Sequence, residues 1–226
     1  MMSLSRRLAQ IADFVPQGSK LADIGTDHGY MPLYLLENDK VDFAAFCDVN
    51  EAPLNVAKMN LANTKISADR YVIRLGDGLE ACRDIEVNTL TLSGMGASLI
   101  LKILRADEEK LKEITTLILS PNIAPWLLRQ DLPKLGFYLV KEALVEENGQ
   151  NYEILLFHRG KGNSLTKEQI YFGQFLPYLP EARDYFLKRK QKDFHKIACM
   201  EKTKNQDLVK SEIDRLKQLW KWWEND

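Results

Sequence analysis

Hydrophobic positions follow two rhythms along the first 160 residues of the chain. Short apolar runs that close on aspartate, glycine or serine are typical of strands buried in a parallel sheet. Stretches in which apolar residues recur every three or four positions are typical of helices that bury one face. These rhythms predict strands over 20–24, 41–47, 71–75, 89–92 and 116–119, and helices over 4–15, 30–37, 51–62, 99–104 and 125–134.

Two further apolar segments, 138–142 and 152–158, flank Glu147-Asn148-Gly149-Gln150 and predict an antiparallel hairpin. Five alternations of strand and helix followed by a hairpin predict an α/β fold. Its sheet would be mostly parallel, with helices on both faces and an antiparallel strand near one edge. The polar turns after the strands would then share one edge of the sheet, where ligands bind in folds of this kind.

A linker over 160–164 separates this region from a helical tail. Two long helical runs follow, over 181–204 and 207–224. In the second run, apolar residues alternate at steps of four and three, which is the spacing of a coiled-coil seam. The two runs therefore predict an antiparallel helical hairpin, whose seam would contain Val209, Ile213, Leu216, Trp220 and Trp223. We predict one domain over 1–160 and a second over 164–226.

The most informative turn follows the first predicted strand, within the sequence LADIGTDHGY that starts at Leu21. A dinucleotide fingerprint requires Gly-x-Gly-x-x-Gly here, because the backbone must approach a pyrophosphate closely. Asp27 stands where the second glycine would be, and its carboxylate would repel a pyrophosphate. S-adenosylmethionine (SAM) has no phosphate and carries a positive sulfonium and a positive ammonium, so the turn favours SAM over NAD. Gly25 would let the backbone approach this cofactor, and Asp27 is expected at positive φ.

Polar residues also follow the neighbouring predicted strands. Asp23 would accept the methionine ammonium of SAM, or would only tie down the turn. Asp48 stands 25 positions later, where α/β cofactor sites hold both ribose hydroxyls, although a surface acid fits the same pattern. Asp77 suits the amino group of the cofactor's adenine, with a surface acid again as the alternative. Gly94 and Gly96 would let the chain pass close to the methyl-transfer centre, or would form a plain turn.

Four other features each have two interpretations. His28 could be a base or a hydrogen-bond donor, although a lone histidine at a helix start is more often structural. The amide of Asn122 could hold a target base, or Asn122 could be a turn residue after a proline. The basic run of Lys188, Arg189, Lys190 and Lys192 could contact phosphate or form a solvated helix face. Trp220, Trp222 and Trp223 could stack on nucleobases, although packing is favoured for the first and last.

Composition narrows the class of protein. The chain has 226 residues, of which 45% are hydrophobic, which suffices for a core and argues against disorder. Its net charge of −1 divides into −4 over 1–162 and +3 over 163–226, so only the tail is basic. Cys47, Cys82 and Cys199 match no C-x-x-C pattern, which predicts reduced thiols and no metal site. No apolar run is long enough to span a membrane, and we expect a cytoplasmic protein.

Six short motifs occur in one order at the spacing of a SAM-binding domain: LADIGTDHGY, CDVNEAP, LGDGL, TLSGMGA, LSPN and EENGQNYEIL. As a set they resemble the bacterial TrmK-type family, the tRNA (adenine-22-N1)-methyltransferases. The resemblance covers about residues 3–160 and, in outline, the tail. It implies a Rossmann-like class I methyltransferase domain followed by a C-terminal coiled-coil domain. It also implies a SAM pocket of Asp23, Gly25, Thr26, Asp27, His28, Asp48, Val49, Asn50, Gly76, Asp77, Gly78, Gly94, Met95 and Gly96.

The same resemblance implies transfer of the SAM methyl group to N1 of adenine 22 in tRNA, with S-adenosylhomocysteine as the other product. N1 has its own lone pair, so catalysis would consist mostly of positioning it against the methyl group. The methylated ring is cationic, and a nearby carboxylate or carbonyl would stabilise the developing charge. Asp27 is the first candidate for that role, and Asn122 and backbone groups near Gly94 are second candidates. His28 is a further candidate catalytic residue, as a base or a hydrogen-bond donor. Arg6, Arg7 and the basic run of the tail would contact tRNA phosphates.

Two other functions fit the same sequence. One is a SAM-dependent methyltransferase of another RNA, a protein or a small molecule. The other is a non-enzymatic SAM-binding regulator whose coiled coil recruits a partner. The sequence has no extra segment to enclose a small substrate, and the tail suits a large substrate better.

Overall fold

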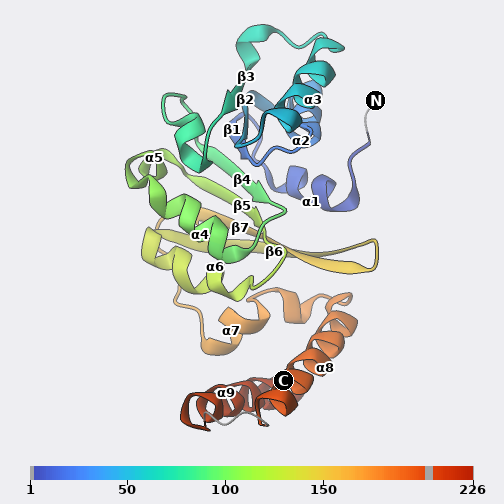
Figure 1. Cartoon of the computed structure of the whole chain (residues 1–226), viewed down its shortest axis with the longest axis vertical. Helices are drawn as coiled ribbons and strands as arrows, with labels where there is room; N and C mark the ends of the chain where they lie inside the picture. Colours follow the sequence, from blue (N-terminus) through green and yellow to red (C-terminus); the bar gives the residue numbers. More distant parts are fainter. Residues whose placement is uncertain (1–2, 202–205, 226) are drawn as a thin grey trace. The chain divides into compact units, whose positions relative to one another are not determined.

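A computed structural model describes residues 3–201 and 206–225. Contacts divide the chain into two compact units, residues 1–163 and 164–226, and each is described by itself. The first unit alternates strands and helices along the chain (Figure 1). Its strands are β1 (Ser19–Ile24), β2 (Val41–Asp48), β3 (Tyr71–Leu75), β4 (Thr89–Ser93), β5 (Thr116–Ser120), β6 (Phe137–Glu147) and β7 (Gln150–Arg159). Its helices are α1 (Arg6–Phe14), α2 (Tyr30–Glu37), α3 (Glu51–Ala62), α4 (Ala97–Ala106), α5 (Glu108–Glu113) and α6 (Trp126–Asp131), with short 3-10 turns at Ala68–Arg70, Gly78–Cys82 and Leu132–Leu135.

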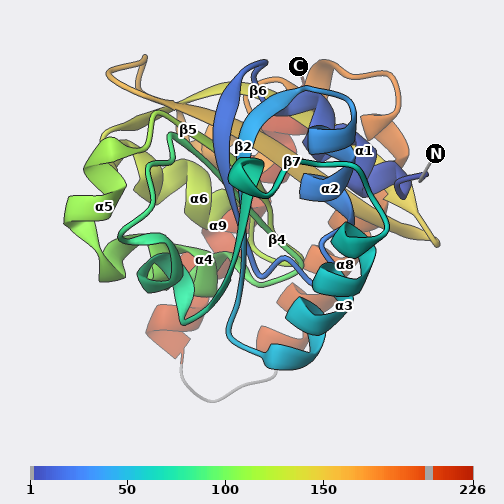
Figure 2. The same cartoon turned by 90° about the horizontal axis from the view of Figure 1, so that it is seen from above.

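The seven strands form one sheet in the order β3-β2-β1-β4-β5-β7-β6. The strands β1 to β5 are parallel, whereas β7 runs antiparallel to both of its neighbours. Figure 2 shows α1, α2 and α3 on one face of the sheet and α4, α5 and α6 on the other. The predicted mostly parallel sheet, covered on both faces and antiparallel near one edge, is confirmed. Its strand order reverses between β1 and β4, which is where such sheets bind ligands.

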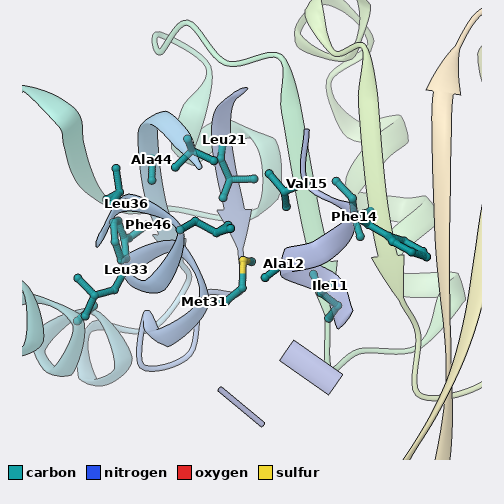
Figure 3. Packing of buried hydrophobic residues seen from close by; sticks show 14 of the residues in the cluster. Ile11, Ala12, Phe14, Val15, Leu21, Met31, Leu33, Leu36, Ala44 and Phe46 are labelled. Atoms are coloured by element: carbon teal, nitrogen blue, oxygen red, sulfur yellow. The ribbon is translucent and has the colours of Figure 1, made fainter. Parts of the chain in front are cut away.

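The helices α1 and α2 bury their apolar residues in a hydrophobic core on one face of the sheet (Figure 3). Ser5 caps α1 by accepting a hydrogen bond from the backbone N–H three residues later. The apolar stripe of this helix then buries Ile11 and Phe14. Helix α2 contacts α1, α3 and β2, and it buries Met31 close to Phe46 of the sheet. This packing fixes the position of the turn that leads from β1 into α2.

The hairpin strands β6 and β7 are longer than the sequence predicts, and they pair directly up to the turn. Asn148 and Gly149 both have positive φ, 52° and 76°, as in a tight two-residue hairpin. Beyond the pairing with β5, the arm of the hairpin extends past the rest of the sheet (Figure 1). Arg129 of α6 is fully buried and forms ion pairs with Glu142 of β6 and Glu153 of β7. This buried ion cluster fastens α6 to the hairpin.

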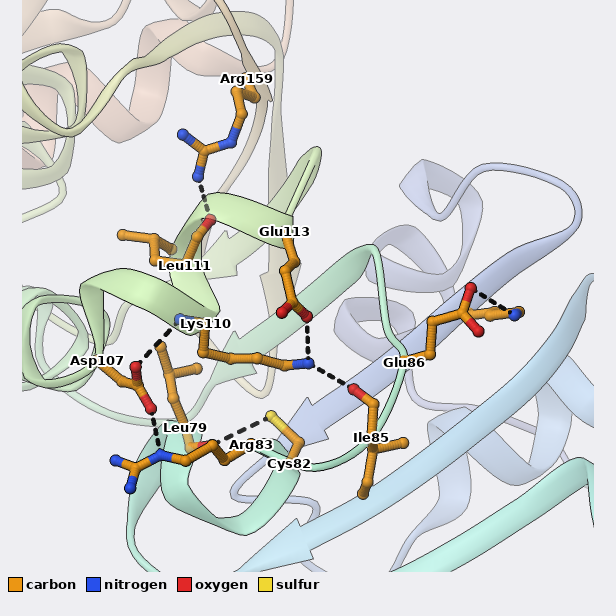
Figure 4. A network of polar contacts seen from close by, with 11 residues as sticks. Leu79, Cys82, Arg83, Ile85, Glu86, Asp107, Lys110, Leu111, Glu113 and Arg159 are labelled. Carbon is orange, nitrogen blue, oxygen red and sulfur yellow. Dashed lines mark hydrogen bonds and ion pairs between the residues drawn. The ribbon is translucent and has the colours of Figure 1, made fainter.

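The sequence rhythm does not predict α5, because this helix is short and rich in charged residues. Asp107 caps it by accepting a hydrogen bond from the backbone N–H of Lys110 at 3.0 Å, and Arg83 Nε donates to the same carboxylate at 2.7 Å. Lys110 is buried, donates to a backbone carbonyl before β4 and pairs with Glu113 at 2.7 Å (Figure 4). Polar contacts, together with the buried side chain of Leu111, therefore hold this helix in place.

The second unit contains α7 (Lys167–Phe172), a 3-10 turn at Leu176–Tyr178, α8 (Ala182–Met200) and α9 (Gln206–Asn225). Successive residues of α8 pair with progressively earlier residues of α9, as in Lys190 with Glu224 and Lys196 with Glu212. The two helices are therefore antiparallel, as the sequence predicts. Residues 202–204, which the sequence assigns to the end of the first run, lie outside the described residues.

The buried face of α9 is wider than a coiled-coil seam. The predicted seam residues Ile213, Leu216 and Trp220 are buried, and so is Leu219, which is off the seam. Trp222, whose role the sequence left open, stacks on Phe172 of α7 with the ring centroids 5.7 Å apart. The indole Nε1 of Trp220 donates to Asp193 at 3.0 Å. These contacts place both tryptophans in the packing of the helical unit rather than on a free stacking surface.

Two negative observations apply to the described residues. Their helices include none that is long and apolar enough to cross a membrane. Over the same residues, no group of three or more histidine, cysteine, aspartate or glutamate side chains is arranged to hold a metal ion. The thiols of Cys47 and Cys82 are buried, and that of Cys199 is exposed.

Candidate active site

A cavity of about 510 Å³ lies at the carboxyl ends of β1, β2 and β4, where the strand order reverses. The turns after these strands line most of it, and the start of α1 and the end of β6 line the rest. Two other hollows, of about 680 and 520 Å³, are lined by none of the predicted site residues. Ten of the fourteen predicted SAM-pocket residues line the first cavity: Asp23, Gly25, Thr26, Asp27, His28, Asp48, Val49, Asn50, Gly94 and Met95.

Asp23 lies near the end of β1 and is buried. Its two carboxylate oxygens accept hydrogen bonds from Thr26 Oγ1 at 2.8 Å and from Thr91 Oγ1 at 2.6 Å. Burial disfavours the charged form and raises the pKa of Asp23 to about 6, although the two hydroxyl groups act in the opposite direction. The carboxylate is therefore held in one orientation in the cavity wall, in a setting where its charge is poorly solvated.

The turn after β1 has the backbone that its sequence predicts. Asp27 has φ = 53°, which confirms its predicted place in the left-handed region. The backbone N–H groups of Gly25 and Thr26 both donate to the Cys47 carbonyl, at 2.8 and 3.0 Å, and so tie the turn to β2. A Cβ at Gly29, where φ is 73°, would lie 2.8 Å from a β carbon of α3. Glycine therefore allows α2 to begin this close to α3.

Asp48, at the end of β2, is the second buried carboxylate of the cavity. Its Oδ1 accepts the backbone N–H of Asn50 at 2.9 Å, and its carbonyl accepts the N–H of Gly76 at 3.0 Å. The turn after β3 is thereby fastened beside the cavity. Four predicted pocket residues nevertheless do not line the cavity: Gly76, Asp77, Gly78 and Gly96. Their contact with SAM stays a prediction.

Residues 4–155 match a protein-family model described as a methyltransferase domain. The chain belongs to this methyltransferase family. The methyltransferase is 36% identical over 159 residues to the tRNA (adenine(22)-N(1))-methyltransferase of Bacillus subtilis (strain 168). That match covers 70% of this chain and 66%, slightly under two thirds, of the relative's length. The family resemblance predicted from the six motifs is confirmed.

Solved structures agree over nearly the whole length of the methyltransferase. The Streptococcus pneumoniae protein Sp1610, in complex with S-adenosyl-L-methionine, has a TM-score of 0.82 and 32% identity, and the match covers 96% of this chain and 99% of that chain. M. capricolum TrmK, in complex with S-adenosyl-homocysteine, has a TM-score of 0.85 and 25% identity, and the match covers 99% of each chain. The likeness therefore extends to the helical tail as well as to the sheet.

Asp27 and His28 line the cavity of the methyltransferase from the turn after β1. Asp27 Oδ1 lies 3.6 Å from His28 Nε2, and the two side chains are 78% and 45% exposed. The imidazole packs edge-on against Tyr30 with the ring centroids 5.6 Å apart, and its Nδ1 is buried with no partner among the described residues. Asp27 thus presents an exposed carboxylate to a ligand, beside an imidazole that packs against Tyr30.

Arg7, a predicted phosphate contact, lines the cavity and makes several contacts within the first unit. Its guanidinium donates from Nε to Ser120 Oγ at 2.9 Å, from Nη1 to Asn122 Oδ1 at 3.0 Å and from Nη2 to the Ser120 carbonyl. It also lies over the ring of Tyr152, with Cζ 4.0 Å from the ring centroid. The side chain is directed into the fold, because α1 packs against β5 and the hairpin. Asn122 does not itself line the cavity, but its Nδ2 donates to the Gly94 carbonyl at 2.6 Å.

The other predicted phosphate contacts divide into two groups. Arg6, Lys188 and Lys192 are exposed. Arg189 instead lies over the Tyr171 ring at 4.1 Å, and Lys190 pairs with a glutamate of α9. Two of the four residues of the basic run, Arg189 and Lys190, therefore make contacts within the second unit.

The sequence does not predict six of the lining residues: Ser5, Leu8, Tyr30, Met31, Ser93 and Glu147. Tyr30, Met31 and Ser93 each adjoin a predicted turn, so a wider window around the motifs would have included them. Ser5 and Leu8 lie at the start of α1, and Glu147 lies in the hairpin. These residues follow no local signal, because the packing of α1 on the sheet and the pairing of β7 with β5 bring them to the cavity.

Proposed function

We propose that the protein transfers the methyl group of SAM to N1 of an adenine in tRNA, at position 22 as in the relatives named for that activity. The observation that carries the proposal is the acidic cavity where the strand order reverses, with an exposed carboxylate at residue 27. The tRNA (adenine(22)-N(1))-methyltransferase of Bacillus subtilis supports the substrate. The related structures with S-adenosyl-L-methionine and S-adenosyl-homocysteine support the cofactor.

The chemistry of the cavity fits a cationic methyl donor. SAM has a net charge of +1, whereas its demethylated product is neutral, so a negative site favours the donor over the product. A Cβ at Gly25 would lie 3.2 Å from Met95 Cε, so glycine keeps the turn after β1 open to a ligand. SAM supplies an electrophilic methyl group when bound. The lining carboxylates are those of Asp23, Asp27, Asp48 and Glu147, against the single guanidinium of Arg7.

The buried acids have separate roles in holding the donor. Asp23, fixed by two threonine hydroxyls, would accept the methionine ammonium. Asp48, held at the cavity wall by the backbone N–H of Asn50, would accept the ribose hydroxyls. Asp77 would bind the adenine amino group of the cofactor from the neighbouring turn.

Methyl transfer to adenine N1 requires no base, because N1 attacks with its own lone pair. The contribution of the chain is to align the ring and to stabilise the positive charge that develops on it. Asp27 is the candidate for the second task, since its carboxylate is exposed to the cavity and can also accept the N6 amino group. His28 would orient that carboxylate from 3.6 Å away, and Asn122 is the second candidate for holding the base.

Asp27→Asn tests this assignment. We expect the single-turnover rate of methyl transfer to fall by about 100-fold, as when one transition-state partner is removed, with SAM affinity changed much less. The assay uses labelled SAM and bulk bacterial tRNA, and nuclease digestion then identifies the labelled nucleoside. Asp39→Asn is the matched control, because Asp39 is another exposed aspartate with positive φ, 50°, and does not line the cavity.

Two results would count against the proposal. An unchanged rate for Asp27→Asn would remove Asp27 from the chemistry. Wild-type protein that labels a nucleoside other than 1-methyladenosine, or none, would refute the substrate and favour another methyl acceptor or a regulatory SAM-binding protein.

We also propose that residues 1–160 bind SAM and that residues 164–226 contact tRNA, with the protein acting in the cytoplasm. The exposed positive charges of Lys188 and Lys192 on α8 support this assignment for the tail, and that of Arg6 supports a further contact from α1. Phosphate contacts of this kind make binding weaker as salt concentration rises.

A further inference from the structure

Arg7 connects three segments that lie far apart in the sequence. Its guanidinium donates to the hydroxyl and the carbonyl of Ser120 at the end of β5, and to Asn122 Oδ1 just beyond it. Its backbone N–H donates to Glu147 Oε1 of β6 at 3.2 Å, and the ring of Tyr152 of β7 lies against its guanidinium. The hairpin therefore supports Arg7 from one side, while Arg7 holds the loop after β5 on the other.

The loop after β5 transmits this contact to the cavity. Asn122 Oδ1 accepts from Arg7, and Asn122 Nδ2 donates to the carbonyl of Gly94 at 2.6 Å. The backbone N–H of Asn122 also donates to the Met95 carbonyl at 2.8 Å. Gly94 and Met95 both line the cavity. A donor on one side and an acceptor on the other give the Asn122 amide a single orientation.

A strained residue directly follows this loop. Ala124 has φ = 58°, a left-handed conformation that residues with a Cβ adopt at an energetic cost. Ile123, just before it, is 69% exposed. Ile123 also lies close to Gly96, where a Cβ would be 3.3 Å from its Cγ1. The loop thus presents an exposed amide and an exposed aliphatic side chain next to the wall of the cavity.

We propose that Arg7 is a positioning residue for methyl transfer, which holds the loop of residues 120–123 in the conformation that receives the target adenine. The inference rests on the proposed function. An adenine offers an apolar face, which suits Ile123, and an N6 amino donor beside N1, which suits the amide oxygen of Asn122. Arg7 itself lines the cavity, but its guanidinium is engaged by the loop, so it acts through Asn122 rather than by holding the base. Because Ser120, Asn122 and the Tyr152 ring engage its guanidinium, Arg7 is not a phosphate contact.

The test compares Arg7→Ala and Arg7→Lys with wild type in the full-length protein. We expect the single-turnover rate at saturating SAM and tRNA to fall by about tenfold or more for Arg7→Ala. The dissociation constants of SAM and tRNA should change less than about threefold, and the salt dependence of tRNA binding should be unchanged. Arg7→Lys keeps one charged donor and should recover part of the rate, and it serves if the alanine variant does not fold.

Arg70→Ala is the matched control for loss of a structural arginine. Arg70 donates to Asp39 Oδ1 at 2.8 Å, to the Val41 carbonyl at 2.8 Å and to the Asp42 carbonyl at 3.3 Å, near the start of β2 and away from the cavity. Its removal should leave the methyl-transfer rate unchanged in protein that remains folded. A double-mutant cycle adds the Asn122→Ala change: Arg7→Ala and Asn122→Ala together should slow transfer no more than the larger single effect.

Each alternative result has a definite meaning. An Arg7→Ala variant that binds tRNA more weakly, with a smaller salt dependence and an unchanged rate, would make Arg7 a phosphate contact and overturn the proposal. Rate losses that add in the double variant would overturn the route through Asn122. Wild-type protein that forms no 1-methyladenosine would refute the proposed function itself, whereas active wild type with a fully active Arg7→Ala variant would refute this inference alone.

Discussion

Replacing Asp23 by asparagine is expected to make the protein more stable at neutral pH and less able to bind SAM. Asp23 is buried, and burial raises the pKa of its carboxyl from 3.8 to about 6. A raised pKa means that the folded protein holds this proton more tightly than the unfolded chain does. The charged carboxylate therefore destabilises the fold above pH 6, and this penalty disappears as pH falls from 6 towards 4.

The size of the effect follows from the pKa. A rise from 3.8 to about 6 corresponds to about 3 kcal/mol of folding free energy at pH 8. Asparagine has nearly the same shape but no charge, and the hydroxyls of Thr91 and Thr26 can accept a hydrogen bond as well as donate one. We expect Asp23→Asn to recover about 1 to 3 kcal/mol at pH 8, because part of the gain is offset by the burial of an amide.

Urea unfolding of both proteins without SAM, at several pH values between 4.5 and 8, measures this difference. The advantage of Asp23→Asn should be largest at pH 8 and should shrink as pH falls, while its SAM affinity is below wild type. Asp131→Asn is a control that should change stability in the opposite direction. Lys134 and Arg105 lower the pKa of the Asp131 carboxyl, so removing that charge should lower the free energy of unfolding. If Asp23→Asn is less stable than wild type at pH 8, or its advantage does not vary with pH, the reasoning is wrong.

Three further predictions concern the fold and the tail. Arg129→Met should lower the free energy of unfolding by about 3 to 5 kcal/mol, because it removes the cation that pairs with two buried glutamates. Chemical denaturation measures this loss, and a loss below about 1 kcal/mol would show that the ion cluster is not stabilising. Gly29→Ala should destabilise more than Gly149→Ala, since both glycines have positive φ but only Gly29 has atoms within 3 Å of an added Cβ; equal thermal shifts would contradict the steric argument. The double variant Lys188→Ala and Lys192→Ala should reduce the slope of tRNA affinity against salt concentration by the equivalent of about one to two phosphate contacts, measured by titration at several salt concentrations. An unchanged slope would mean that this face of α8 does not contact tRNA phosphates.

The sequence by itself determined the local features of the first unit. The position of each parallel strand, the acidic turn after β1 and the positive φ of Asp27 could all be predicted. These features depend on burial periodicity and on the backbone preferences of a few adjacent residues, which the local sequence contains. For the same reason, the motifs that follow β1, β2 and β4 supplied most residues of the cavity.

Tertiary structure alone decided which of the predicted turns line the cavity and which distant residues join them. The turn at Gly76–Gly78 lies beside the cavity, whereas Glu147 lines it from the hairpin. The same holds for Arg7, which looks like a surface charge in the sequence and is directed into the fold by the packing of α1 on β5 and β7. Contacts between segments more than 100 residues apart depend on strand order and helix packing, and no local pattern encodes them. A basic residue can therefore be recognised from sequence, but whether it faces phosphate or holds a loop is decided by its neighbours in space.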